Sequence, residues 1–357
     1  MPYVLDHADT IKVWPLETFD VPNPTGLVPL VDQALIARGS RTGIPEHENF
    51  LPIIARLNKG QPPFPSEEYS HDHALFPDTF SHEWGYIKGA DGAVYENGGC
   101  LQPWRLPSFP VDGAYQCDRA IALVGRWGGD TWHYPMEALV GLIAVPSDWL
   151  ADPTVLIHVS KINDYVRQWT EVAGIDPERL RTGVLHAKTL CVPRMGMCGA
   201  PYPAQVRWLR SIVSPIITSQ SLTPGPRLLI VARRTGRRTL RNQQDVEGVC
   251  KRMARELGLG FHVHSDDALP PLAEQFRLFA RADVVVVPHG GTAVLMPAMR
   301  PGSIYLDLMD LDYMNVCSMR LAYFCGVRYG ACATRNAIAN VRALIDIMVR
   351  VLHTQNM

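Results

Sequence analysis

The 357-residue sequence lacks several features that would assign its class at once. It contains no apolar run of about 18 residues, the length that a membrane-spanning helix needs, and no apolar region near its start that would mark a signal peptide. It contains no Gly-x-Gly-x-x-Gly and no phosphate-binding loop of the Walker type. We therefore expect no membrane span, no dinucleotide cofactor and no nucleoside triphosphate hydrolysis.

The low net charge and the spacing of the cysteines also exclude some classes of protein. The formal net charge is -1, which argues against a general binder of nucleic acid or of membrane surfaces. The eight cysteines are scattered without a Cys-x-x-Cys pair. In a chain of this size we expect reduced thiols and a cytoplasmic or otherwise soluble protein, or a lumenal one if an anchor has been removed.

The most informative stretch of the sequence is 282–308. A short valine-rich run at 283–287 predicts a strand that is buried on both faces. Pro288 ends it, and a glycine turn leads into a helix expected at 293–299 and a second strand at 303–308. Amides at a helix N-terminus bind anions, so the turn is a candidate phosphate seat. Ligands of open parallel sheets bind at the carboxyl ends of strands, where the sequence has His289, Gly290, Gly291, Thr292 and Asp307.

A basic segment follows the strand expected at 227–232, at the same edge of the sheet. Guanidinium groups bind phosphate through paired hydrogen bonds and stay charged, so Arg233 and Arg238 are candidate phosphate ligands. Asn242 supports them at the start of the next helix. The alternative is a solvated basic loop without a ligand.

The first half of the chain carries a different constellation. Asp130, His133 and Glu137 are spaced to share one face of a helix expected at 132–145, directly after a strand at 120–125. A histidine beside a carboxylate can act as a general base, so His133 or Asp130 is the candidate. The alternative is that Asp130 caps the helix and His133 is a satisfied, partly buried ring.

The second half of the chain contains two weaker features. Glu274, on a helix expected at 271–280, could hold ribose hydroxyls or could be exposed surface. Asp310 and Asp312 form an Asp-x-Asp pair that could hold a metal–nucleotide complex, but the pair comes late in the chain. We expect no metal site and no cofactor.

Strands alternate with helices from residue 119 onward, which predicts α/β domains with parallel sheets. A serine- and proline-rich stretch at 216–226 separates two such halves. We expect residues 1–118 to form an irregular arm with hairpins, packed on the first domain. Residues 119–215 then form the first α/β domain and residues 216–357 the second, whose last helix, 337–353, could cross back.

These motifs, in this order, resemble glycosyltransferase family 61, the family of plant xylosyl and arabinosyl transferases and animal O-linked N-acetylglucosaminyl transferases. The resemblance covers roughly residues 120–310. It rests on Trp132-His133-Tyr134 with Glu137, on the strand ending in Arg233 with Arg238 and Asn242, and on Glu274-Gln275, Ala282-Asp283, His289-Gly290-Gly291, Pro301-Gly302 and Asp307.

The resemblance implies a GT-B architecture, in which two Rossmann-like domains with parallel sheets face a central cleft. It further implies an inverting, metal-independent transfer of xylose or N-acetylglucosamine from a UDP-sugar to a hydroxyl of a glycan or glycoprotein. The second domain would bind the nucleotide-sugar and the first the acceptor. The alternatives are a non-catalytic nucleotide- or glycan-binding protein on this scaffold and a metal-dependent transferase that uses Asp310 and Asp312.

Overall fold

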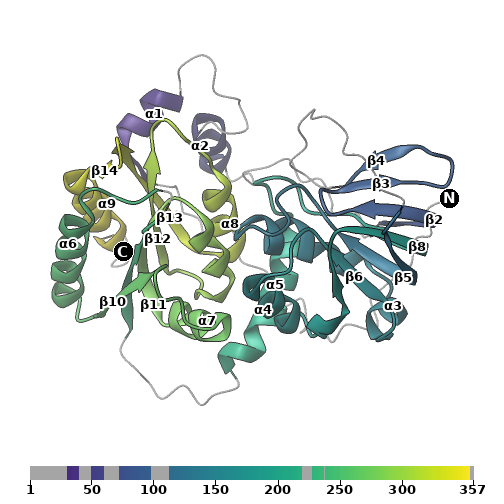
Figure 1. Ribbon diagram of the computed structural model, residues 1–357. Helices are drawn as coiled ribbons and strands as arrows, with labels where there is room; N and C mark the ends of the chain where they lie inside the picture. The colour runs from purple at the N-terminus through teal and green to yellow at the C-terminus, as the bar shows by residue number, and fades with distance from the viewer. Residues whose placement is uncertain are drawn as a thin grey trace. The chain divides into compact units, whose positions relative to one another are not determined.

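The computed structural model describes residues 30–39, 50–59, 72–97, 112–218, 227–236 and 238–353 (Figure 1). The chain divides into two compact units. Unit 1 comprises residues 1–19 and 68–212, and unit 2 comprises residues 20–67 and 213–357. Helix α5 (Pro203–Thr218) contains the boundary between them.

Unit 2 is built on a sheet in which β14 (Ile338–Ala339) is antiparallel and the other described strands are parallel. The strand order is β1-β13-β12-β11-β9-β10, with β14 paired to β13. The bounds are β1 (Leu30–Val31), β9 (Leu228–Arg233), β10 (Gly260–Ser265), β11 (Ala282–Pro288), β12 (Ile304–Asp310) and β13 (Arg328–Arg335). This confirms the predicted parallel α/β organisation for the second half of the chain.

Helices cover both faces of this sheet, as Figure 1 shows. On one face, α6 (Gln243–Glu256) and α9 (Val341–His353) pack against side chains such as Leu229, Val231 and Leu306. The other face carries α7 (Leu272–Ala280), the 3₁₀ helix η6 (Gly291–Ala298) and α8 (Cys317–Cys325). Burial on both faces explains why β9 and β11 are apolar without alternation.

The order of the strands reverses direction between β9 and β11. From β9 the chain passes to β10 on one side, and then crosses to β11 on the other side of β9. Such a switch point leaves a crevice at the carboxyl ends of the two strands, where ligands of open α/β sheets bind. The segment after Arg233 and the turn after Pro288 both start there.

Residues 30–39 and 50–59, the described part of the chain before residue 68, form elements that the sequence did not predict. They contain α1 (Gln33–Gly39) and α2 (Phe50–Asn58). Strand β1 pairs in parallel with β13, through Leu30 with Gly330, so it belongs to the sheet of unit 2. The expectation that residues 1–118 pack as one arm on the first domain therefore does not describe this segment. A two-residue edge strand has no local sequence signature, because only its distant partner defines it.

The sheet of unit 1 is mixed, which corrects the prediction of a second parallel sheet. Its order is β4-β3-β2-β8-β5-β6-β7. The parallel part comprises β5 (Tyr115–Leu123), β6 (Leu156–Val159), β7 (Leu180–Arg181) and β8 (Val184–Pro193). Strands β2 (His73–His82), β3 (Tyr86–Lys88) and β4 (Val94–Glu96) extend it antiparallel from β8. Antiparallel hairpins add strands in this way, and they agree with the hairpins expected before residue 119.

The helices of unit 1 follow the parallel strands. The segment expected as one α-helix at 132–145 is a π-helix, η3 (Tyr134–Ala138), continued by a 3₁₀ helix, η4 (Leu139–Ala144). The unit also contains α3 (Ser147–Ala151), α4 (Asp164–Val172) and η5 (Pro177–Arg179). Single π-turns are frequent at functional sites, because they redirect side chains within a helix.

The cysteines and helix lengths bear on two sequence expectations. Cys198 forms a disulfide, so the expectation that all thiols are reduced is wrong at this position. Spacing could not reveal it, because pairing depends on the fold. In the described part of the chain, no helix combines the length and the apolar character needed to cross a bilayer.

Packing in unit 2 leaves no room for a side chain at Gly330. A β-carbon there would lie 2.7 Å from Leu306 Cδ2 and 3.1 Å from Ile347 Cγ2. We expect Gly330→Ala to lower the free energy of unfolding by about 1–3 kcal/mol through overpacking. Urea unfolding measures the change. The control is Gly248→Ala on the exposed surface of α6, where a β-carbon meets no atom within 4 Å, and which should stabilise by about 0.5–1 kcal/mol. Equal effects of the two changes would contradict this account.

Candidate functional site

Two guanidinium groups converge on Gly290 at the switch point of unit 2. A β-carbon built on Gly290 would lie 3.1 Å from Arg238 Nη1 and 3.3 Å from Arg234 Nη2. Arg238 Nη1 also donates a hydrogen bond of 2.8 Å to the carbonyl oxygen of His289. Both cations reach this point because residue 290 has no side chain. Two neighbouring positive charges beside a bare peptide are arranged to bind an anion of more than one charge.

Arg234, which sequence reasoning missed, takes the position that was predicted for Arg233. The Arg233 guanidinium instead makes a paired ion bridge with Glu247 of α6, with Nε–Oε1 at 2.9 Å and Nη2–Oε2 at 2.7 Å. Alternation along β9 explains the difference, because Leu229 and Val231 face α6 and Arg233 continues that face. Arg234 therefore points to the other side of the strand, toward Gly290.

Arg234 is only partly satisfied by its surroundings. Its nearest charged partner is Asp266, whose Oδ2 lies 3.7 Å from Arg234 Nε. That Nε is buried and donates no hydrogen bond within the described residues. The Arg234 guanidinium therefore keeps N–H groups that can donate hydrogen bonds to a ligand.

The turn also offers backbone donors. Gly290 is the N-cap of η6, and Gly291 and Thr292 occupy its first turn. The first N–H groups of a helix have no acceptor within the helix. Together with the arginines, these amides supply hydrogen-bond donors of the kind that bind a phosphate or diphosphate.

A buried ion pair lies directly beneath the turn. His289 Nδ1 and Asp307 Oδ2 are 2.8 Å apart, and the Tyr329 hydroxyl donates to the same oxygen at 3.0 Å. Burial lowers the pKa of His289, but the Asp307 charge and hydrogen bonds to Asp307 and Cys317 outweigh it and raise the pKa to about 10. His289 is therefore positively charged at neutral pH. Asp307 is fully buried and holds His289 rather than an exposed ligand.

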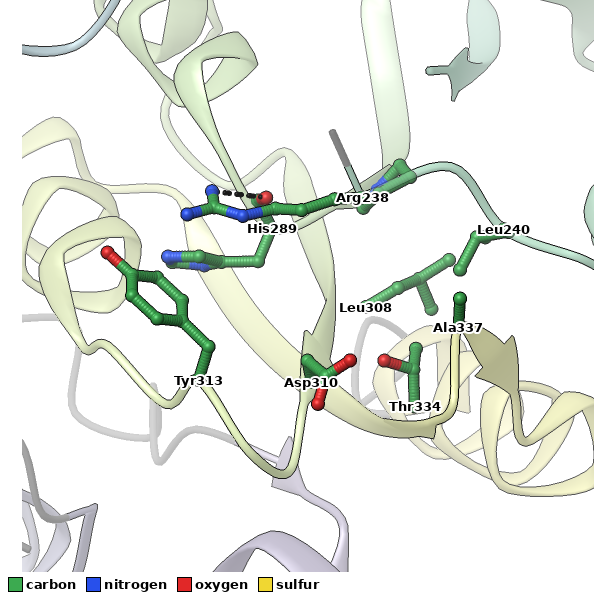
Figure 2. Close-up of a pocket in the computed structure, with 9 residues that line it drawn as sticks. Arg238, Leu240, His289, Leu308, Asp310, Tyr313, Thr334 and Ala337 are labelled. Carbon is green, nitrogen blue, oxygen red and sulfur yellow. Dashed lines mark hydrogen bonds between the residues drawn. The ribbon is translucent and has the colours of Figure 1, made fainter. Parts of the chain in front are cut away.

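A pocket opens beside Arg238 and His289 (Figure 2). Tyr313, which the sequence had not singled out, forms one wall, and its ring centroid lies 4.6 Å from Arg238 Cζ. Asp310 and Thr334 contribute polar groups to the lining. Asp310 Oδ1 accepts a hydrogen bond of 2.8 Å from the amide of Asp312, so the Asp-x-Asp pair forms a local turn. Among the described residues, no group of three or more potential metal ligands gathers there or elsewhere.

Two other predicted ligands of this site have separate environments. Asn242 bonds to the backbone of Ala339, accepting from its N–H at 2.8 Å and donating to its oxygen at 3.0 Å. It therefore anchors β14. Glu274 is exposed in the first turn of α7, which follows the carboxyl end of β10. It lies at the same edge of the sheet as Arg234, and within the described residues no side-chain partner draws it to the turn.

Unit 1 carries the second predicted constellation, and here the structure brings two of its three members together. His133 Nδ1 lies 2.8 Å from Glu137 Oε1. His133 is partly exposed, whereas Glu137 is buried. The carboxylate holds the proton of the neutral imidazole on Nδ1, which makes Nε2 the basic nitrogen. Asp130 is exposed and contributes its backbone oxygen to the N–H of Tyr134 at 3.0 Å.

A loop from the end of β8 fixes the carboxylate. The Gly199 amide donates to Glu137 Oε1 at 3.4 Å, and the Gly196 amide donates to the Glu137 carbonyl at 2.8 Å. A β-carbon on Gly196 would lie only 2.3 Å from the Met136 oxygen. Close backbone contact therefore holds Glu137, which in turn orients His133. The pair can act as a general base with a fixed direction.

The geometry predicts that Arg233, Arg234 and Arg238 contribute differently to the binding of an anion. We expect Arg234→Ala and Arg238→Ala each to weaken binding of inorganic pyrophosphate about tenfold or more, because each removes a cation at Gly290. Arg233→Ala should have a smaller effect, because its guanidinium is engaged by Glu247. Isothermal titration calorimetry measures the affinities. A larger loss for Arg233→Ala than for Arg234→Ala would refute the assignment.

The buried His289–Asp307 pair makes stability depend on pH. The folded protein holds the His289 proton more tightly than the unfolded chain, whose pKa is near 6.5. The contribution is therefore complete below about pH 6.5 and is lost as the pH rises toward about 10. We expect urea unfolding to show wild type losing a few kcal/mol over this range relative to the double variant His289→Gln, Asp307→Asn. Parallel pH curves for the two proteins would contradict this.

The chain was compared with known proteins. Residues 131–306 match the family model described as Glycosyltransferase 61. A search of the curated proteins finds no relative that matches the chain. The family match spans the His133–Glu137 pair, the arginines, the Gly290 turn and the start of β12 up to Leu306. Residues 131–306 thus form a glycosyltransferase family 61 domain, and the protein is a glycosyltransferase.

Proposed function

We propose that the protein is an inverting, metal-independent glycosyltransferase. In this proposal it transfers xylose or N-acetylglucosamine from a UDP-sugar to a hydroxyl of a glycan or glycoprotein. The observation that carries the proposal is the convergence of Arg234 and Arg238 on Gly290, at the switch point of the parallel sheet. Neither a metal nor another cofactor is needed in this mechanism, because fixed cations receive the leaving group.

The donor half of the proposal uses unit 2. A UDP-sugar carries two negative charges on its diphosphate, and transfer adds a further charge to the leaving oxygen. Arg234, Arg238 and the amides at Gly291 and Thr292 would receive that charge. The positively charged His289 beneath the turn keeps its carbonyl oriented toward Arg238. The pocket at Tyr313 offers an aromatic face beside the diphosphate seat for the nucleoside.

The acceptor half uses His133 of unit 1. In the proposed step, His133 Nε2 takes the proton of the acceptor hydroxyl, and the acceptor oxygen forms a bond to the anomeric carbon of the donor sugar. The bond from that carbon to the diphosphate oxygen breaks at the same time, and UDP leaves with the electron pair. Attack opposite to the leaving group inverts the anomeric centre. Glu137 stabilises the imidazolium that forms.

Two broader features fit this proposal. We propose a GT-B architecture, which the division into two α/β units supports. We also propose an oxidising compartment, such as a lumen, rather than the cytoplasm, because disulfides persist where thiols are not kept reduced, and Cys198 is in a disulfide.

The base assignment predicts a specific kinetic pattern. We expect His133→Ala to lower kcat by about 10²–10⁴-fold with little change in the KM for the UDP-sugar, because a general base acts in the transition state. Glu137→Gln should lose about tenfold or more. The control is Asp130→Ala, whose exposed side chain should matter little. Release of UDP from UDP-xylose and UDP-N-acetylglucosamine, with and without EDTA, measures the rates.

The outcomes separate the alternatives. Loss of activity in EDTA that manganese restores would favour a metal-dependent transferase using Asp310 and Asp312. UDP binding without turnover, by a wild-type protein given both donors and a range of acceptors, would favour a non-catalytic nucleotide-binding protein. Normal kcat in folded His133→Ala would remove His133 as the base.

A further inference from the structure

An exposed tryptophan lies beside the proposed base. Trp127 follows β5 in the loop that leads to His133, and 45% of it is exposed. Its ring centroid is 6.2 Å from that of His133, and the two planes are tilted by 32°. The Arg126 guanidinium lies over the indole, with Cζ 5.4 Å from the ring centroid. The indole thus presents a large apolar surface next to the proposed base.

The loop that carries Trp127 is held rigidly. The Ser160 hydroxyl accepts from the Gly125 amide at 2.9 Å and donates to the Gly125 carbonyl at 2.7 Å. A β-carbon on Gly128 would lie 2.5 Å from Ser160 Oγ, and one on Gly129 would lie 2.6 Å from Lys161 Cβ. The Trp127 carbonyl accepts from the Asp130 amide at 2.8 Å. This packing presets the indole, as a binding platform requires.

Sugar chemistry identifies the kind of ligand that fits this platform. A pyranose with equatorial hydroxyls has a face made of C–H groups, which packs on an aromatic ring, while its hydroxyls stay at the edge. Tryptophan offers the largest such ring, and half-exposed indole gains by being covered. A sugar stacked there would present an edge hydroxyl toward His133, where the proposed reaction needs it.

We propose that Trp127 is the acceptor-sugar platform, which binds a pyranose ring of the acceptor glycan and sets which hydroxyl meets His133. This inference rests on the proposed function and adds the position and chemical class of the acceptor subsite. Arg126 lies along the ring and limits its rotation. Trp127 acts by positioning the substrate, so its loss affects acceptor binding more than the chemical step.

The same strand supplies a matched control. Tyr115 lies at the opposite end of β5, is 46% exposed and is also covered by an arginine, with Arg181 Cζ 5.3 Å from its ring centroid. Tyr115→Ala therefore removes an equally exposed, arginine-covered ring that is far from the base along the strand. Trp127→Phe keeps an aromatic face of smaller area.

The test uses an array of immobilised oligosaccharides that includes xylo-oligosaccharides and chito-oligosaccharides. Wild type and Tyr115→Ala should bind the same glycans, Trp127→Ala should lose binding about tenfold or more, and Trp127→Phe should lie between them. With a bound glycan as acceptor, Trp127→Ala should raise its KM more than it lowers kcat.

Each variant is first checked for the thermal shift that UDP produces. Absence of that shift in wild type counts against the proposed donor, independently of the glycan result. The platform is overturned if wild type binds no glycan, if Trp127→Ala binds as wild type does, or if Tyr115→Ala loses binding equally. Glycan binding that is unchanged in Trp127→Ala while a protein acceptor binds more weakly would assign the indole to a protein partner and overturn the platform too.

Discussion

The buried pair of His289 and Asp307 is the interaction on which the site in unit 2 depends. His289 directly follows β11, and Asp307 lies within the neighbouring strand β12, where it pairs with Val287. Placing two charges in this interior is costly unless each is paired and hydrogen-bonded. Here the Asp307 carboxylate accepts hydrogen bonds from His289 Nδ1 and from the Tyr329 hydroxyl. The pair therefore locks the first residue after β11, and the turn can leave the sheet in only one direction.

That locked residue positions the cations above it. The His289 carbonyl accepts from Arg238, and its ring lies next to Tyr313, which Arg238 also covers. The guanidinium is thus held by one hydrogen bond and one aromatic face, with further N–H groups available in its planar fork. With a net charge of -1, the chain has no strong overall field. Recognition of an anion here would depend on these short-range donors rather than on long-range attraction.

The sequence predicted the location of both sites better than their composition. Strand–turn–helix patterns identified β11, its turn and β12, and the switch-point rule identified the edge where they meet the loop after β9. The sequence could not show whether Arg233 or Arg234 faces the turn at Gly290. Strand β9 is apolar on both faces, so no alternation of polar and apolar residues indicates which side chain faces α6. The sequence put Asp307 at the end of a strand, whereas β12 continues to Asp310. The hydroxyl that Asp307 binds in the interior belongs to Tyr329, in a strand that the sequence did not reveal.

Other features could not be predicted from the sequence because they depend on contacts between distant parts of the chain. Strand β1 exists only through its pairing with β13, and the Cys198 disulfide depends on the folded geometry. The π-helix at 134–138 keeps the i to i+4 relation between His133 and Glu137 that the helical spacing predicted. A local pattern thus survives a change of helix type when the pair it concerns is only one turn apart.

The two candidate sites share a structural feature. In each, a glycine lets other groups of the protein approach the backbone closely at the point where the candidate side chains gather. At Gly290 the neighbours are the arginines themselves, and at Gly196 the neighbour is the backbone of the segment that carries Glu137. Each glycine therefore admits a neighbour that a side chain would keep away. In the proposed mechanism, this close packing sets the donors and the base in direction before the substrate binds, which is how an enzyme stabilises developing charge without reorganising at the moment of reaction.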